Sequence, residues 1–308
     1  MRTFLSLAIA LVFAGMLASC GGSGGEKQKT IGASFLTQTH VFYQDMIKAI
    51  EEEAAKQGFN LRIQFAEFDS RRQNDQIETL LAQNVDALLV APADSSAVGS
   101  IIAQANAQGV PVFTVDIAAQ DAEVVSHIAS DNYAGGVMLA EYLAKQLDGK
   151  GTIAIIDHPT VESVQQRTKG FLETLQKYPE MQVVARPPGE GQRDKALRVA
   201  QDVVQAHPDL DAIFAINDDS ALGALAAVEA AGKQNDIIIV GFDGTPEART
   251  AIQEGKALKA DAVQYPDQIG KKAIDIIATY LQGGKVPEMV PVEVGLIDVE
   301  SLNQEPAQ

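Results

Sequence analysis

The chain has 308 residues, of which 46% are hydrophobic and 21% are charged, so it can bury a large core and favours two lobes over one. Its 24 lysines and arginines are outnumbered by 41 aspartates and glutamates, which gives a formal net charge of −17 at pH 7. Such a charge repels phosphate backbones and anionic membranes, so nucleic acid is excluded as an expected partner.

The first 20 residues have the pattern of an export signal. Arg2 precedes an apolar stretch over 4–16, which is too short to span a membrane as a mature helix. Cys20 follows Leu-Ala-Ser and is the only cysteine, so no internal disulfide is possible. This setting resembles the lipobox of bacterial lipoproteins, which implies a lipid on Cys20 that anchors the exported protein to a bacterial membrane. The alternative is an ordinary cleavage site with an incidental cysteine. Residues 21–29 are expected to form a flexible tether.

Strand and helix patterns alternate through the first half of the chain. Apolar side chains at Phe42, Met46 and Ile50 have the spacing of a helix face, and Gly58 marks the end of that helix. Such alternation predicts parallel strands joined by crossover helices on both faces of a sheet. The expected strands are 30–36, 61–65, 86–90 and 110–115, and the expected helices are 42–57, 74–83 and 97–108.

The second half repeats this order. The matching segments are 30–31 with 152–153, 86–90 with 211–215 and 110–116 with 237–243, at offsets of 122, 125 and 127. Self-similarity of this kind predicts two doubly wound, Rossmann-like α/β lobes, because a β/α barrel would not restart midway. The expected strands are 152–156, 181–185, 211–216 and 237–242, and the expected helices are 163–177, 193–206 and 220–231.

Three segments are expected to carry the chain between the lobes as a hinge. Two further strands, at 124–129 and 257–263, precede abrupt polar turns, and a third crossing is expected near 291–293, before a last strand at 292–297. The predicted N-terminal lobe is 30–130 plus 265–291, the C-terminal lobe is 131–264 plus 292–302, and 303–308 form a tail.

A buried strand at 237–242 delivers Phe242 and Asp243 to its carboxyl end. Thr245 can cap the following helix and Pro246 fits its first position, so Asp243 has no local role. Ligands of open α/β sheets bind where strands end, which makes this stretch one wall of a predicted small-molecule site.

Polar residues gather at the other strand ends as well. Carboxylates and amides form paired hydrogen bonds with vicinal hydroxyls, and aromatic faces cover the C–H face of a ring, so this set fits a sugar or polyol. The candidates are Asp116, Asp131, Asn132, Asn217, Asp243 and Gln264, with the aromatic residues Phe42, Tyr43 and Phe242.

Each candidate also has a structural interpretation. Asn217 could cap the next helix, although Asp218 and Asp219 stand beside it for that role. Either Asp131 or Asn132 is expected to cap the helix that follows them. Phe42 could belong to the core, and Arg167 could belong to a surface ion pair.

The sequence offers no sign of a metal, a cofactor or an enzyme. The four histidines, His40, His127, His158 and His207, lack the spacing of a metal site. Gly189 and Gly191 lack the third glycine of a dinucleotide fingerprint, and no nucleophile, base and orienting group are placed together.

Several motifs resemble the ribose-binding members of the type I periplasmic binding proteins, over about 30–294. The motifs are VSHIASDN at 125–132, AHPD at 206–209, ND at 217–218 with ALGA at 221–224, VGFDGTP at 240–246, and Gln264 with PDQIG at 266–270. The resemblance implies two lobes with three crossovers, a sugar closed between them, and delivery to an ABC permease and its ATPase. LacI-type repressors share the lobes, but this chain has no DNA-binding head.

The resemblance also implies roles for individual residues. It places the aromatic Phe42 and Tyr43 against a sugar ring, Asp116 and Asp243 on sugar hydroxyls, and Phe242 beside Asp243. The remaining polar contacts fall on Asn132, Arg167, Asn217 and Gln264.

Three positions depart from the ribose pattern. His40 replaces an asparagine, Ile117 replaces an arginine, and Gly191 replaces a stacking aromatic residue. Loss of one charged hydrogen bond alters affinity by about 1.5–3 kcal/mol, so we expect a sugar or polyol other than ribose. The alternatives are a sensor that presents its closed form to a chemoreceptor or histidine kinase and, less favoured, an enzyme acting on sugars.

Overall fold

The structure, a computed structural model, describes residues 28–304. The predicted export signal, the lipidation site Cys20, residues 21–27 of the tether and residues 305–308 of the tail lie outside the described residues. Within the described part, no helix is both long and apolar enough to cross a membrane.

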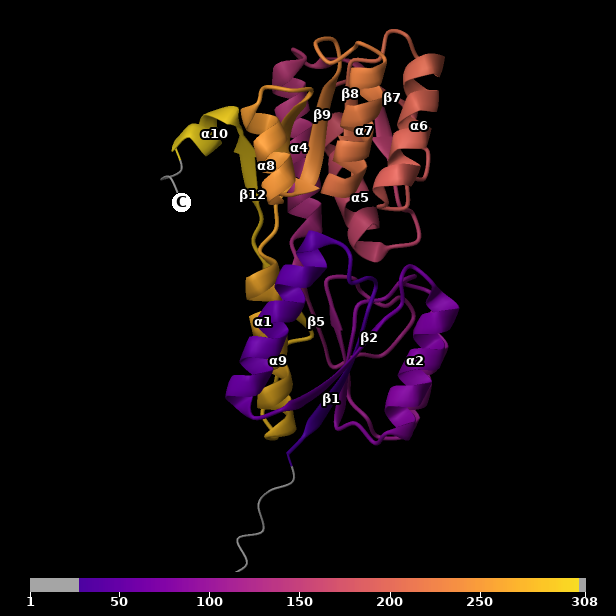
Figure 1. Ribbon diagram of the computed structural model, residues 1–308, viewed down its shortest axis with the longest axis vertical. Helices are drawn as coiled ribbons and strands as arrows, with labels where there is room; N and C mark the ends of the chain where they lie inside the picture. The colour runs from indigo at the N-terminus through magenta and orange to yellow at the C-terminus, as the bar shows by residue number, and fades with distance from the viewer. Residues whose placement is uncertain (1–27, 305–308) are drawn as a thin grey trace, which may run out of the picture.

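Two six-stranded sheets form two lobes that are stacked along the long axis of the molecule (Figure 1). The first sheet is parallel throughout, and β1 lies between β2 and β3. Its strands, in spatial order, are β11 (Met289–Val292), β5 (Ser126–Ser130), β4 (Val112–Val115), β3 (Ala87–Val90), β1 (Thr30–Phe35) and β2 (Asn60–Phe65).

The second sheet repeats this order, with one antiparallel strand at its edge. That strand is β12, which pairs with β10. In spatial order the strands are β12 (Gly295–Asp298), β10 (Leu258–Val263), β9 (Ile238–Asp243), β8 (Ala212–Ala215), β6 (Lys150–Ile156) and β7 (Glu180–Ala185). The prediction of two doubly wound lobes is therefore confirmed.

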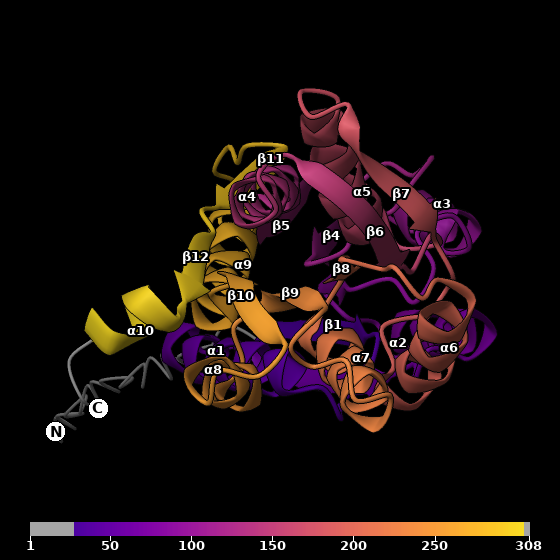
Figure 2. The ribbon, with the colours of Figure 1, turned by 90° about the horizontal axis from the view of Figure 1, so that it is seen from above.

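Helices cover both faces of each sheet, because the central strands are apolar on both sides. Figure 2 shows α6 and α7 on one side of the second sheet and α4 and α5 on the other. The first lobe contains α1 (Val41–Gln57), α2 (Ser70–Ala82), α3 (Gly99–Ala107) and α9 (Pro266–Leu281). The second contains α4 (Asn132–Gln146), α5 (Glu162–Leu175), α6 (Arg193–Ala206), α7 (Asp218–Ala230), α8 (Pro246–Gln253) and α10 (Val299–Gln304).

The chain passes between the sheets after β5, after β10 and after β11. The single strand expected at 292–297 is wrong, since Val292 ends β11 in the first sheet and Gly295 begins β12 in the second. The reversal between them turns β12 antiparallel to β10. The expected tail also begins too early, because α10 runs to Gln304 and buries Leu302.

Helices α4 and α5 cross at close range because, at the crossing, a glycine of each helix lies against the backbone of the other. A Cβ on Gly136 would lie 1.9 Å from the carbonyl oxygen of Arg167, and one on Gly170 would lie 2.2 Å from the carbonyl oxygen of Tyr133. A Cβ on Gly135 would lie 2.4 Å from the ring of Phe242. The crossing therefore sets the position of Arg167 relative to β9.

The two lobes touch directly through hydrogen bonds around the loop after β3. Val161 supplies no side-chain cap to α5, and the hydroxyl of Ser95 from the other lobe accepts from the backbone N–H of Glu162 at 2.9 Å. The backbone N–H of Ser95 also donates to the carbonyl oxygen of Thr160 at 3.0 Å. The N-terminus of α5 is thus capped across the lobes, in a closed arrangement.

Candidate functional site

A cavity lies between the lobes, and side chains of both lobes line it. Eight of the ten side chains that the sequence assigns to ligand binding line it, and they come from both lobes. They are His40, Phe42, Tyr43, Asp116, Arg167, Asn217, Asp243 and Gln264.

Two aspartates at repeat-related strand ends face each other's lobe across this cavity. Asp116 follows β4 with φ 64°, and Asp243 ends β9 with φ 128°. Positive φ is uncommon for residues with a side chain, and such backbone strain gathers at ligand sites. Both strands therefore deliver a carboxylate on an unusual backbone to the cleft.

Asp116 is buried and paired with Tyr43. The Tyr43 hydroxyl donates to Oδ2 of Asp116 at 2.7 Å. Burial raises the pKa of Asp116 to about 6, while the hydrogen bond from Tyr43 and the charge of Arg167 oppose the shift. Burial and the neighbouring Asp116 carboxylate raise the pKa of Tyr43 well above 10, so its hydroxyl is a donor at neutral pH.

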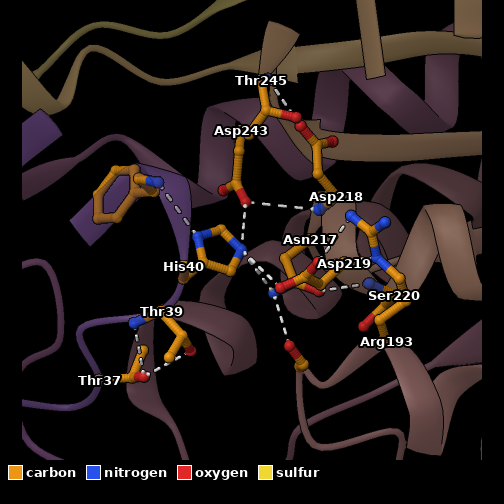
Figure 3. Close-up of polar contacts among 12 residues, drawn as sticks. Thr37, Thr39, His40, Arg193, Asn217, Asp218, Asp219, Ser220, Asp243 and Thr245 are labelled. Atoms are coloured by element: carbon orange, nitrogen blue, oxygen red, sulfur yellow. Dashed lines mark hydrogen bonds and ion pairs between the residues drawn. The ribbon is translucent and has the colours of Figure 1, made fainter. Parts of the chain in front are cut away.

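Asp243 is the meeting point of groups from three segments. Its Oδ1 accepts from Nε2 of Gln264 at 2.7 Å and lies 4.0 Å from Nη1 of Arg167. Its Oδ2 lies 3.4 Å from Nε2 of His40 and accepts, at the same distance, from the backbone N–H of Asp218 (Figure 3). The carboxylate thus links the first lobe, the second lobe and the crossing at Gln264.

His40 reaches the second lobe from the N-terminus of α1 (Figure 3). Its Nδ1 accepts from the backbone N–H of Phe42 at 3.2 Å, so in the neutral ring the proton is on Nε2. That nitrogen points at Asp243 and lies 3.6 Å from Oδ2 of Asp219. Where the ribose pattern has asparagine, this chain therefore has a donor directed at the opposite lobe.

Arg167 is 4% exposed, so the alternative of a surface ion pair is wrong. Its Nε donates to Oδ1 of Asn132 at 2.8 Å, and Nη1 donates to the carbonyl oxygen of Ile216 at 2.7 Å. The guanidinium lies 3.8 Å from the centre of the Phe242 ring. Burial lowers the pKa of Arg167, while Asp243 and Asp116 raise it.

Asn132 and Phe242 do not line the cavity, although the sequence assigns both to the ligand. They lie behind Arg167 and hold its guanidinium toward the cleft through the contacts just described. The neighbouring Asp131 caps α4 by accepting from the backbone N–H of Ala134. One residue of that pair therefore caps a helix, and the other positions the arginine.

Asn217 both caps α7 and faces the cavity. Its Oδ1 accepts from the backbone N–H of Ser220 at 2.9 Å, so the expectation that Asp218 or Asp219 would take the cap is wrong. Its Nδ2 donates to the carbonyl oxygen of Gly191 at 3.1 Å. The expected cap of α8 is confirmed, since Thr245 accepts from the backbone N–H of Ala248 and Pro246 begins the helix.

Sequence reasoning missed part of the cavity wall. The missed residues are Leu36, Thr37, Phe68, His158, Val161, Ser163, Val164 and Ile216. The internal repeat could have located one of them, because an offset of 122 carries the predicted Phe42 to Val164.

The two other departures from the ribose pattern also line the cavity. Ile117 presents an aliphatic side chain beside Asp116. Gly191 has φ +65°, and a Cβ there would lie 3.3 Å from Nδ2 of Asn217. An aromatic residue at 191 would therefore displace Asn217. Among residues 28–304, no group of three or more His, Cys, Asp and Glu side chains is arranged to hold a metal ion.

Residues 31–285 match the family described as a periplasmic binding protein domain. The chain belongs to the periplasmic binding protein family. The family resemblance drawn from the sequence is thereby confirmed.

Relatives within this family cover nearly the whole chain. The ribose import binding protein of Bacillus subtilis (strain 168) is 38% identical over 280 residues, which is 91% of this chain and 90% of that protein. The structure of a Mycobacterium smegmatis ABC transporter solute binding protein with bound glycerol has a TM-score of 0.86 at 32% identity and covers 91% of this chain and 98% of that one. A Bacillus halodurans C-125 solute binding protein with bound myo-inositol has a TM-score of 0.84 at 29% identity, with 92% and 98% covered.

Proposed function

We propose that this protein captures an uncharged monosaccharide or polyol between its lobes and delivers it to an ABC importer. The observation that carries the proposal is the convergence of Asp116 and Asp243, from opposite lobes, on one cavity that also holds the donors Arg167 and Gln264. The relatives described above are import or transport proteins that are named for, or hold, a pentose, glycerol or an inositol. They support import rather than a sensor role.

The chemistry of the wall favours a neutral ligand with an apolar face. Two carboxylates face one arginine, so an anionic ligand would meet net repulsion. Carboxylate oxygens accept hydrogen bonds from hydroxyls, while Phe42, Phe68 and Ile117 offer apolar surface to C–H groups. Because the positions of His40, Ile117 and Gly191 differ from the ribose pattern, we propose a ligand other than ribose.

Hinge closure is the proposed mechanism. In an open form each lobe would present its own strand ends to water, with Asp116 and Tyr43 on one side and Asp243 and Asn217 on the other. A ligand that bonds to both sides binds the closed form more tightly, and this differential affinity shifts the population toward closure. The permease would then recognise the closed form.

Export and membrane anchoring complete the proposal. The family is exported to the periplasm, which agrees with the signal pattern of residues 1–20. The lipid on Cys20 remains an expectation from sequence, and mass spectrometry of the membrane fraction tests it, with Cys20→Ala as the control that should be released.

A ligand screen tests the function. We expect one compound among pentoses, hexoses, deoxy sugars, glycerol, xylitol and inositols to raise the melting temperature of the purified protein. At 100 times its dissociation constant, the true ligand adds about 2.7 kcal/mol to the free energy of unfolding. Absence of stabilisation by every neutral polyol, with stabilisation by an amino acid or an anion, would reject the proposal.

Loss of the hydrogen bond by which Ser95 caps α5 across the lobes should weaken ligand binding, although Ser95 does not line the cavity. In Ser95→Ala, α5 loses the side-chain cap that Ser95 supplies in the closed form, and a lost cap costs about 0.5–2 kcal/mol. Because the open form lacks this bond already, we expect calorimetric affinity to fall by about 2-fold to 30-fold. Ser96→Ala is the matched control, since Ser96 bonds to Asp94 within its own lobe. Unchanged affinity in Ser95→Ala would show that the bond adds nothing to closure.

A further inference from the structure

A second pair of carboxyl groups lies behind Asp243, away from the cavity. Asp261 projects from β10, which lies next to the edge strand β12, and Asp218 is the first residue of α7; their exposed fractions are 0% and 1%. Neither oxygen of Asp261, nor Oδ1 of Asp218, has a hydrogen-bond partner among the described residues. Three buried acceptor atoms without a donor call for a physical explanation.

Gly241 brings the two side chains together. A Cβ on this glycine of β9 would lie 3.2 Å from Oδ1 of Asp218 and 3.2 Å from Oδ2 of Asp261. Both carboxyl groups therefore lie over the bare backbone of Gly241, and each acts on the pKa of the other through a side-chain hydrogen bond. Any side chain at 241 would press on both of them.

Two neighbouring carboxylates in a buried site cannot both be ionised at low cost, so one of them retains a proton. Burial raises the pKa of both carboxyl groups, the charge of Asp218 raises that of Asp261 further, and the nearby backbone N–H of Gly244 opposes this rise.

The surrounding cations offset this repulsion only through space, without a hydrogen bond to Asp261. Arg167 uses its hydrogen bonds on Asn132 and on the carbonyl oxygen of Ile216, and Arg249 donates from Nε to the carbonyl oxygen of Gly244. Among the described residues, neither arginine donates a hydrogen bond to Asp261. The charged groups on β10 and on the elements packed against it are Lys259 on β10, Asp243 on β9, Asp298 on β12, Glu141 and Lys145 on α4, Asp218, Asp219 and Glu229 on α7, and Glu247 and Arg249 on α8. The charge of Arg167 on α5 also acts on Asp261.

We propose that Asp261 is a neutral acid at physiological pH, that it donates its proton in a hydrogen bond to Asp218, and that this pair positions the ligand carboxylate Asp243. The positioning role rests on the proposed function. The shared proton rests on burial and contact alone.

The hydrogen bonds of Asp218 connect the pair to the ligand site (Figure 3). Its Oδ2 accepts from the backbone N–H of Thr245 at 2.7 Å, and its own backbone N–H donates to Oδ2 of Asp243 at 3.4 Å. Asp218 thus holds the turn of residues 243–245 at both ends, at the point where Asp243 has φ 128°. Ionisation of Asp261 would push Asp218 away and release this turn.

The sign of the pH dependence follows from the raised pKa of Asp261. The folded protein keeps a proton that the unfolded chain releases above about pH 3.9, so this stabilisation falls as pH rises toward the pKa of the folded state. Ligand affinity should fall only as pH rises through the pKa of the folded state, where Asp261 ionises and the turn loses its support.

Asp261→Asn tests the proposal, since an amide keeps the donor and the shape but cannot ionise. We expect its melting temperature to exceed that of the natural protein at pH 8–9 and to depend less on pH. Its affinity should stay within about 3-fold at pH 7 and should not fall at alkaline pH. Asp261→Ala lacks the donor and should bind about 10-fold more weakly at pH 7. Asp298→Asn, on the neighbouring strand β12, is the matched control and should keep the natural pH profile of stability.

The two measurements separate the shared proton from the proposed function. The melting profile needs no ligand, so it can be read even where no sugar binds. The proposed shared proton is wrong if the melting temperature of Asp261→Asn depends on pH as strongly as that of the natural protein. It is also wrong if the variant melts at a lower temperature at every pH. The positioning role is wrong if the melting temperature of Asp261→Asn depends less on pH but its ligand affinity still falls at alkaline pH as in the natural protein.

Discussion

Asp243→Ala is expected to weaken binding of the cognate ligand by at least about 3 kcal/mol, or more than 100-fold. The substitution removes the acceptor of Gln264 and leaves the buried Arg167 without its closest carboxylate. Asp243 is also expected to accept from ligand hydroxyls, and each hydrogen bond to a charged group is worth about 1.5–3 kcal/mol. Isothermal titration calorimetry with the compound identified by the screen measures the loss.

Two further variants separate a lost contact from a damaged turn. Asp243→Asn retains a side chain that tolerates positive φ, and it should still lose at least tenfold in affinity because the charge is gone. Asp219→Ala removes a carboxylate that also faces His40 but is 30% exposed, and its affinity should stay within about 3-fold. Equal losses in Asp219→Ala and Asp243→Ala would contradict the assigned site.

Gly136→Ala is expected to lower the free energy of unfolding by about 3 kcal/mol or more. The new methyl group would lie 1.9 Å from the carbonyl oxygen of Arg167, and backbone on both sides leaves no flexible side chain to move aside. Overpacking usually costs about 1–3 kcal/mol, and a contact this short belongs at or above that range. Thermal unfolding should show a fall of at least about 6 °C.

Gly99→Ala is the matched control for Gly136→Ala. This glycine also lies in a helix, but a Cβ there would lie 3.6 Å from its nearest neighbours, which is ordinary contact. Alanine should therefore be neutral or slightly stabilising. Equal melting temperatures for Gly136→Ala and the natural protein would mean that α4 and α5 can separate freely. The position of Arg167 would then need another explanation.

The fold could be predicted because local patterns and the tertiary structure agree. Helix α6 was expected at 193–206 and occupies Arg193–Ala206, since its apolar spacing and its packing against the sheet require the same residues. The last strand could not be placed, because the apolar run over 289–297 does not reveal which sheet each residue joins. That choice depends on pairing with β5 and β10, which are distant in sequence.

The site was harder to predict where one residue serves two purposes. Asn217 caps α7 with its Oδ1 and faces the cleft with its Nδ2. The hydrogen bond from Nδ2 to the carbonyl oxygen of Gly191 reveals this second role, and it joins residues that are distant in sequence. The sequence placed Asn132 and Phe242 near the ligand, but the crossing of α4 and α5 inserts Arg167 between them and the cavity. Side-chain depth of this kind comes from helix packing, which strand order alone does not determine.

The repeat-related aspartates have a consequence for ligand orientation. Since 116 and 243 are equivalent positions of two copies, a polyol bound as proposed would meet similar acceptors at either end and would have two poses related by end-for-end reversal. The two poses differ because the two aspartates have different hydrogen-bond donors beside them. Asp116 accepts from the phenol of Tyr43, and Asp243 accepts from the carboxamide of Gln264. Exchanges at these two neighbours would therefore reverse or mix the bound poses, and with them the preferred stereoisomer, while leaving both acceptors in place.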